Sequence, residues 1–105
     1  MKCFFADAPA ELASAAVAEL KPSAIPSVET PAPASGIADP AVEGKRVYVL
    51  CENDLAVPPQ VQELVLKGTG LEWKVVRIEA GHCPMISRPA ELTKILVDVA
   101  DEFEQ

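Results

Sequence analysis

The sequence predicts an α/β fold in which two short parallel strands alternate with two helices. Two apolar runs, at residues 46–51 and 73–78, are rich in β-branched and aromatic residues, as the strands of a parallel sheet are. Each run is followed by a polar loop and then by apolar residues at helical spacing. Because parallel strands need a crossover connection, this order predicts a right-handed β-α-β unit and a closing helix.

Residues 1–44 are expected to form an opening strap, one helix and a long Pro-rich connection. Asp7 is a good N-cap residue for this helix, and Pro9 and Glu11 suit its first turn. The apolar residues of the helix recur at helical spacing: Leu12, Ala16, Val17 and Leu20. Five prolines between residues 22 and 40 argue against a regular helix or an internal strand in the connection.

Residues 45–105 carry the regular part of the predicted fold. The first strand leads into a short amphipathic helix that ends near Gly68, and the second leads through the loop AGHCPMISR to a helix that begins at Pro89. This last helix has an apolar stripe: Leu92, Ile95, Leu96, Val99 and Phe103. Both strands are apolar on both faces, so we expect the sheet to need neighbours and the chain alone to expose apolar surface.

Composition and charge argue against several classes of partner. The chain has a net charge of −7 and no block of Lys or Arg, which disfavours nucleic acid and anionic membrane surfaces. No stretch approaches the ~18 apolar residues of a membrane span, and Asp7 and Glu11 interrupt any signal-peptide core. The three cysteines, Cys3, Cys51 and Cys83, fit neither a zinc site nor a redox pair, which favours free thiols in the cytoplasm.

One carboxylate and the only histidine follow the two predicted strands. Asp54 lies three residues after the first strand and His82 four residues after the second. Since ligand sites of open α/β sheets lie at the carboxyl ends of the strands, we expect these side chains to meet. The carboxylate would accept a hydrogen bond from one ring nitrogen and leave the other as a general base. A turn-forming acid and an ordinary surface or core histidine are the alternatives.

The two strand-end loops resemble those of α/β-hydrolases. From Lys45 onward the chain is similar to the esterases and hydroxynitrile lyases of the plant methylesterase type and to their microbial relatives. The residues that match the two loop patterns are Asp54, Pro58 and Gln62, and then His82, Pro84, Ser87 and Pro89. The segment FFADAPAELA near the start also resembles part of the cap of that family.

This resemblance implies that the chain is the C-terminal part of an α/β-hydrolase. Residues 1–44 would be a remnant of the cap region with the Pro-rich connection, and residues 45–105 the C-terminal β-α-β-α part. Asp54 would be the acid and His82 the base of a catalytic triad that acts on a small ester or carbonyl compound, with no metal or organic cofactor. Met85 would line the substrate pocket, although core packing is an equal alternative.

The triad nucleophile is absent from the pattern. The family's nucleophile elbow is Gly-x-Ser-x-Gly, and none of the serines stands in it: Ser14, Ser23, Ser27, Ser35 and Ser87. Cys83 is a poor substitute because neighbours in sequence point apart. We therefore expect a fragment that is inactive alone, with its nucleophile upstream of Met1 in a longer protein.

Two other interpretations and two questions stay open at this stage. The chain could be an inactive truncated protein that acts as an interaction module, or a small α/β module that binds a ligand between Asp54 and His82. The sequence does not separate ester hydrolysis from lyase chemistry, and it does not give the oligomeric state.

Overall fold

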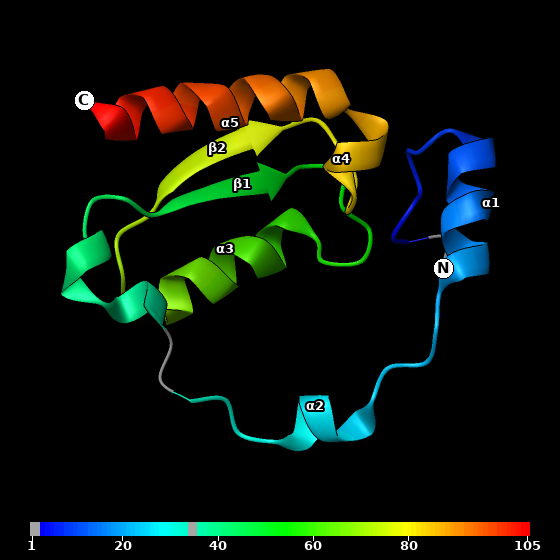
Figure 1. The fold of residues 1–105 in the computed structure, drawn as a ribbon, viewed down its shortest axis with the longest axis horizontal. Coiled ribbons are helices and arrows are strands. Elements are labelled where there is room, and N and C mark those ends of the chain that lie inside the picture. The colour runs from blue at the N-terminus through cyan, green and yellow to red at the C-terminus, as the bar shows by residue number, and fades with distance from the viewer. Residues whose placement is uncertain (1–2, 34–35) are drawn as a thin grey trace.

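The chain forms a two-stranded parallel sheet enclosed by helices in the computed structural model, which describes residues 3–33 and 36–105 (Figure 1). Strand β1 spans Val47–Cys51 and strand β2 spans Lys74–Ile78. Each strand begins one residue later than the sequence predicts. The pairing nevertheless reaches the predicted start of the first strand, since the Lys74 amide donates to the Arg46 carbonyl at 2.9 Å.

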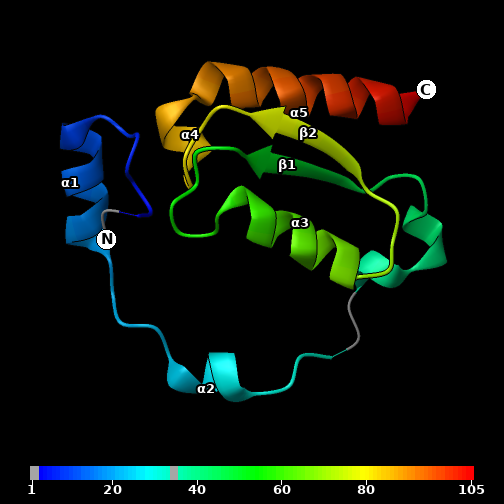
Figure 2. The ribbon, with the colours of Figure 1, turned by 180° about the vertical axis from the view of Figure 1, so that it is seen from behind.

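Helices cover both faces of this sheet. Helix α3, Pro59–Gly68, crosses from β1 to β2 on one face, and helix α5, Pro89–Glu104, lies along the other (Figures 1 and 2). The predicted order of strand, helix, strand and helix is therefore confirmed. Both helices begin with a proline in the first turn, where the missing N–H removes no helical hydrogen bond.

The predicted loop before α5 contains a short helix that the sequence reasoning missed. Helix α4 spans Pro84–Ser87, and its first residue, Pro84, is buried. Proline at the first helical position has the required φ angle, so a single turn forms between His82 and α5.

The N-terminal part contains helix α1, Ala10–Glu19, as expected, but Asp7 does not cap it. The N-cap position is held by Pro9, and no side chain caps the helix. The Asp7 carboxylate instead accepts a hydrogen bond from the Gly81 amide, 74 residues away, at 2.7 Å. The sequence predicts that the Asp7 carboxylate accepts from an amide at the start of α1. In the structure it accepts from the distant Gly81 amide instead.

The Pro-rich connection is also more regular than expected, and it runs away from the sheet (Figures 1 and 2). It contains the five-residue helix α2, Ile25–Glu29, and two 3₁₀ turns, Gly36–Ala38 and Pro40–Val42. The expectation of no regular helix here was wrong. Proline stands in the first turn of α2, where it is compatible with a helix. Ser35 lies outside the described residues.

The core is centred on β1 and β2, with contributions from α3 and α5. The buried apolar residues among those described are Leu50, Cys51, Leu66, Ile78 and Ala80. From the predicted apolar stripe of α5, Leu92 and Ile95 pack against Cys51, Ile78 and Ala80, whereas Leu96 is 55% exposed. On β2, Val75 is 42% exposed on the α3 side, where that helix packs chiefly over β1, which agrees with the expectation that this chain exposes apolar surface.

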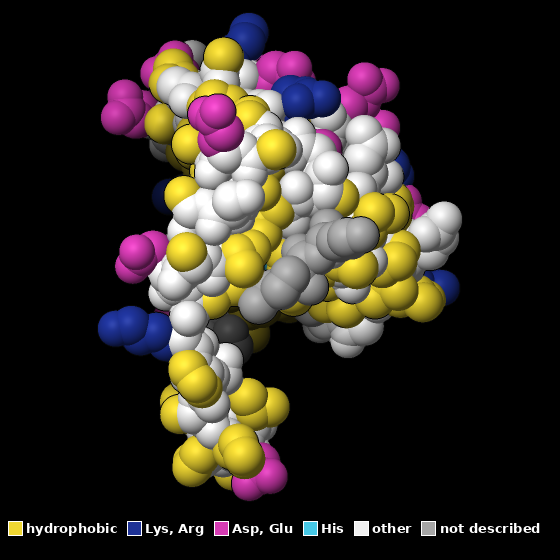
Figure 3. Space-filling view, turned by 90° about the vertical axis from the view of Figure 1, so that its right-hand side faces the viewer, with side chains coloured by type: hydrophobic (Ala, Val, Ile, Leu, Met, Phe, Trp, Pro, Cys, Tyr) yellow, Lys and Arg dark blue, Asp and Glu magenta, His cyan; other side chains and the backbone are white. Residues whose placement is uncertain are grey.

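Apolar surface is exposed over several elements, as the sequence predicts. Figure 3 shows hydrophobic side chains along the side of the molecule that carries α1 and on the projecting connection. Exposed residues include Val28, at 80%, and Leu64, at 68%. Among the described residues, no helix has the length and apolar character that crossing a membrane requires.

Among the described residues, Leu50 is the largest side chain that is fully buried, so its truncation tests this core. We expect Leu50→Ala to lower the free energy of unfolding by about 2–5 kcal/mol, measured by urea denaturation. Leu64→Ala, at a position 68% exposed on α3, is the matched control and should change stability by about 0.5 kcal/mol or less. Equal losses for the two variants would contradict this description of the core.

Candidate active site

The pairing of the two strands brings their C-terminal loops together. Cys51 pairs with Ile78 at the end of the ladder, and main-chain bonds continue beyond it. The Glu52 amide donates to the Ile78 carbonyl at 3.0 Å, and the Asn53 amide to the Ala80 carbonyl at 3.1 Å. The residues that follow, Asp54 in one loop and His82 in the other, are thereby held on the same side.

Asp54 is held by its own loop. Its Oδ1 atom accepts hydrogen bonds from the amides of Ala56 and Val57, both at 2.9 Å, which is the arrangement of an Asx turn. The residue is only 6% exposed. Oδ1 therefore serves the turn, as the alternative of a turn-forming acid predicts. Oδ2 remains available for His82.

Asp54 and His82 are in direct contact, as the sequence predicts. Asp54 Oδ2 lies 2.9 Å from His82 Nδ1, and the His82 side chain is 32% exposed. Within residues 3–33 and 36–105, Nε2 has no hydrogen-bond partner. With the Nδ1 proton directed to the carboxylate, the lone pair of Nε2 is available as a base.

The Asp54 environment keeps the carboxylate ionised. Burial raises the pKa of Asp54, but hydrogen bonds from the Val57 amide, the His82 ring and the Ala56 amide lower it, and the net pKa lies below its usual range. An anion beside Nδ1 favours the tautomer of His82 in which Nδ1 carries the proton. The pair therefore has the electrostatics of an acid and base that work together.

Gln62 anchors the Asp54 loop to the sheet. This α3 side chain is 2% exposed. Its Nε2 donates to the carbonyls of Cys51 at 2.9 Å and Val57 at 2.8 Å. Its Oε1 accepts from the Cys51 amide at 3.1 Å and the Tyr48 hydroxyl at 3.3 Å. The carboxamide thus bonds the end of β1 to the turn that holds Asp54.

The sequence reasoning noted Gln62 only as a match to the family pattern and gave it no role. A signal was present, since Gln62 lies four residues before the buried Leu66 and so on the same face of α3. A polar side chain on a buried helix face needs hydrogen-bond partners. The partners themselves could not be identified without the fold.

Cys83 and Met85 lie just after the histidine. Burial raises the pKa of the Cys83 thiol, and the charges of Asp54 and Asp7 raise it further, so the thiol is a poor nucleophile. Met85 on α4 is 59% exposed, and its expected contact with substrate stays a prediction. Among the described residues, no group of three or more His, Cys, Asp or Glu side chains could hold a metal ion.

An apolar groove lies beside the Asp54 loop. Its volume is about 730 Å³, and its lining comes from α1, the strap before it and the residue after Asp54. The larger apolar side chains of the lining are Phe5, Val17 and Leu55. A ligand with an apolar group would find room here beside Leu55, the residue that follows Asp54.

A family model described as the alpha/beta hydrolase family matches residues 2–95. The chain belongs to this α/β-hydrolase family. The predicted resemblance and fold class are thereby confirmed.

Three fungal and plant relatives illustrate the similarity. The chain is 39% identical over 57 residues to Probable hydrolase R7 of Phoma sp., a match that covers 50% of this chain and 23% of that protein. It is 38% identical over 61 residues to Methylesterase 10 of Arabidopsis thaliana, covering 57% and 22% of the two chains. It is 38% identical over 58 residues to Polyneuridine aldehyde esterase of Rauvolfia serpentina, covering 54% and 22%.

The matched part of this α/β-hydrolase chain thus spans less than a quarter of each of these three relatives. No solved structure matches the chain.

The role of Gln62 can be tested by removing its hydrogen bonds. Gln62→Leu leaves buried main-chain groups of Cys51 and Val57 without these partners, so we expect it to lower the free energy of unfolding by about 3 kcal/mol or more, measured in urea. Gln60→Leu makes the same change at an exposed position of α3 and should have little effect. Similar stabilities of the two variants would show that the Gln62 bonds contribute nothing.

The lowered pKa of Asp54 predicts a dependence of stability on pH. A carboxylate of this kind contributes stability above its unfolded pKa of about 3.9, and loses it as the pH falls through the lower folded value. Asp54→Asn should therefore be less stable than the parent at pH 7, and the difference should shrink below about pH 4. Urea unfolding between pH 3 and 7 measures this, with the exposed Asp98→Asn as control. A difference that does not change with pH would contradict the assignment.

Proposed function

We propose that this chain supplies the acid and the general base of a serine hydrolase that cleaves a carboxylic ester. The observation that supports this most directly is the 2.9 Å contact between Asp54 Oδ2 and His82 Nδ1 at the ends of two parallel strands. Acid before histidine is also the chain order of triads in the α/β-hydrolase fold. In this proposal the nucleophilic serine lies in a segment outside these 105 residues.

The chemistry assigned to the pair follows from its geometry. His82 Nε2 takes the proton of the serine hydroxyl as its oxygen attacks the ester carbonyl carbon, and Asp54 remains ionised and stabilises the imidazolium. The imidazolium then protonates the alcohol oxygen as the carbon–oxygen bond breaks. A water molecule attacks the acyl-enzyme by the same route, which releases the acid and restores the serine.

The names of the relatives support an ester as substrate. They include methylesterases and an aldehyde esterase, and these names belong to those proteins. For the present chain we propose a small ester or related carbonyl compound, with an apolar part in the groove beside Leu55 and with Met85 as a contact. The three cysteines are free, which agrees with the cytoplasmic location that stays a prediction.

We further propose that the boundary between cap and core lies near residue 44. Residues 1–44 hold α1, α2 and the connection, which bury no apolar side chain among the described residues. Residues 45–105 hold both strands and the buried core. This division supports the assignment of the first part as a cap remnant.

A fusion protein tests the proposed function. The part of Methylesterase 10 that precedes the matched region is joined to residues 1–105, and hydrolysis of p-nitrophenyl acetate is measured. We expect activity in the fusion, and a loss of about 10²-fold or more in kcat on His82→Ala or Asp54→Asn. Glu91→Gln, an exposed acid in the first turn of α5, is the control that should retain activity. A folded fusion that is inactive, or one that is indifferent to His82→Ala, would favour an interaction module instead.

The native polypeptide offers an independent check. An antibody to the C-terminus gives its size in the source cell, and the message upstream of Met1 gives its sequence. A protein of about twice this length with an in-frame Gly-x-Ser-x-Gly supports the proposal. A 105-residue polypeptide translated from Met1 contradicts it.

A further inference from the structure

We propose that Asp7 is a positioning residue for His82, acting through the main chain of the histidine loop. The proposal rests on the proposed function only in taking His82 as the base. In this proposal the strap before α1, residues 3–9, helps to set the geometry of the Asp54–His82 pair, although it is far from both loops in sequence.

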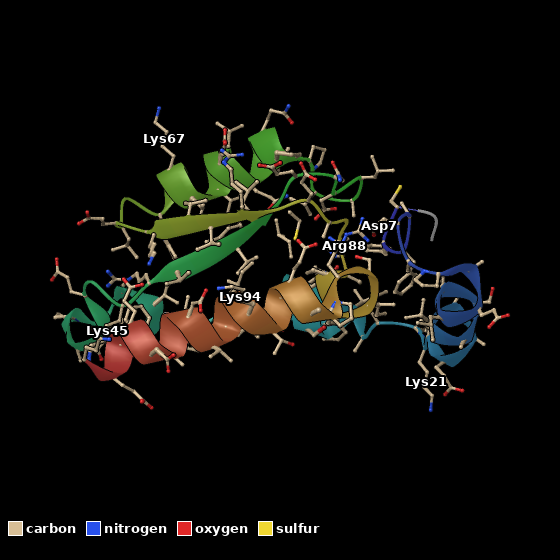
Figure 4. All side chains as sticks on the ribbon, turned by 90° about the horizontal axis from the view of Figure 1, so that it is seen from above. Asp7, Lys21, Lys45, Lys67, Arg88 and Lys94 are labelled. Atoms are coloured by element: carbon tan, nitrogen blue, oxygen red, sulfur yellow. The ribbon has the colours of Figure 1, made fainter. Side chains whose placement is uncertain are left out.

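The main contact is a hydrogen bond between distant segments. The Gly81 amide donates to Asp7 Oδ2 at 2.7 Å, a distance typical of a charged acceptor. Figure 4 shows Asp7 at the end of the sheet nearest α4, where the histidine loop leaves β2. Because Gly81 directly precedes His82, this bond restrains the main chain one residue before the imidazole.

The space around Gly81 is shaped for this carboxylate. Gly81 is buried, and a Cβ atom added there would lie 2.4 Å from Asp7 Oδ1 and 2.9 Å from its Cγ. The φ angle of Gly81 is not positive, so glycine serves close approach here and not an unusual backbone conformation. Any other residue at position 81 would displace Asp7.

The strap also touches the imidazole through Phe4, which directly precedes the Phe5–Ala8 turn that holds Asp7. The Phe4 ring meets the His82 ring edge to face, with centroids 4.9 Å apart and planes at 69°. The turn is closed by the Ala8 amide, which donates to the Phe5 carbonyl at 3.2 Å. One short segment therefore contacts the histidine loop at its main chain and at its side chain.

Asp7 is not needed for the core itself. Helix α1, which follows it, buries no residue, and none of the buried apolar residues comes from the strap. Its Oδ1 atom is buried without a hydrogen-bond partner among the described residues, which is unfavourable for a side chain kept only for stability. Both facts separate a positioning role from a general structural one.

NMR of the single histidine tests the proposal, because a chain labelled with ¹⁵N at histidine gives the signals of His82 alone. In the 105-residue chain we expect the Nδ1-protonated tautomer and a slowly exchanging Nδ1 proton. Asp7→Ala should give an averaged mixture of tautomers and rapid exchange of that proton. Asp7→Asn keeps an acceptor for the Gly81 amide and should restore the parent signals.

The control is Glu11→Ala, which removes an exposed acid from α1 and should leave the His82 signals unchanged. Unchanged His82 signals in a folded Asp7→Ala variant would overturn the proposal. If that variant does not fold, Gly81→Ala decides, because its added Cβ displaces the same carboxylate. The His82 signals of Gly81→Ala must then change as described for Asp7→Ala, and parent-like signals overturn the proposal.

The fusion enzyme separates this proposal from the proposed function. There Asp7→Ala should lower kcat about 10-fold, less than loss of the base itself, with KM little changed and Asp7→Asn close to the parent. One outcome is that His82→Ala inactivates the fusion while Asp7→Ala changes neither kcat nor the NMR signals. Asp7 then has no positioning role, and the proposed function stands. The other outcome is that Asp7→Ala changes the His82 signals while the activity of the fusion does not depend on His82. The proposed function is then wrong, and the positioning role of Asp7 stands.

Discussion

The candidate site depends on the parallel pairing of β1 with β2 and on its continuation past the strands. The Glu52 and Asn53 amides donate to the carbonyls of Ile78 and Ala80. These bonds hold the starts of the two loops close together. Parallel strands place their C-terminal ends at the same end of the sheet, so residues far apart in sequence become neighbours there. Asp54 and His82 meet because the sheet, and not either loop alone, determines where each loop starts.

Gln62 extends this constraint from the strands to the Asp54 turn. A two-stranded sheet leaves the outer edge of β1 without a strand partner, and the Gln62 carboxamide satisfies both main-chain groups of Cys51 on that edge. The same amide nitrogen bonds Val57, whose own amide holds Asp54. Helix α3, β1 and the acid therefore form one hydrogen-bonded unit, and a buried network of this kind is stabilising only when all its members are paired.

Three separate segments thus determine the geometry of the Asp54–His82 pair: the Asp54 turn, the His82 loop and the strap before α1. The Asp54 turn is tied to the sheet by buried bonds, whereas the strap with Phe4 and Asp7 lies outside the core. Strap contacts to the His82 loop involve one hydrogen bond and one ring contact. His82 thus faces an acid that is tied to the sheet, and is itself contacted by a segment outside the core.

Local patterns in the sequence predicted the elements that carry the fold. Strand composition, prolines at helix starts and the apolar stripe of α5 were enough to place β1, α3, β2 and α5, because these signals depend on neighbours a few residues away. The pairing of Asp54 with His82 was also predictable, since the order of parallel strands dictates it. The short helix α2 was missed because proline was taken to exclude a helix that it can begin, and α4 was missed because its single turn lies within a segment predicted as a loop.

Long-range contacts decided the rest. Asp7 was expected to cap α1, but a buried amide 74 residues away is a stronger partner than a helix end open to water. The four hydrogen bonds of Gln62 and the contact of Phe4 with His82 likewise depend on which surfaces meet after folding. The sequence by itself determined the two strands, the helices α1, α3 and α5 and the two chemical groups, because their signals are local. The tertiary structure alone decided what holds those groups in place, because hydrogen-bond partners are selected by burial and not by distance along the chain.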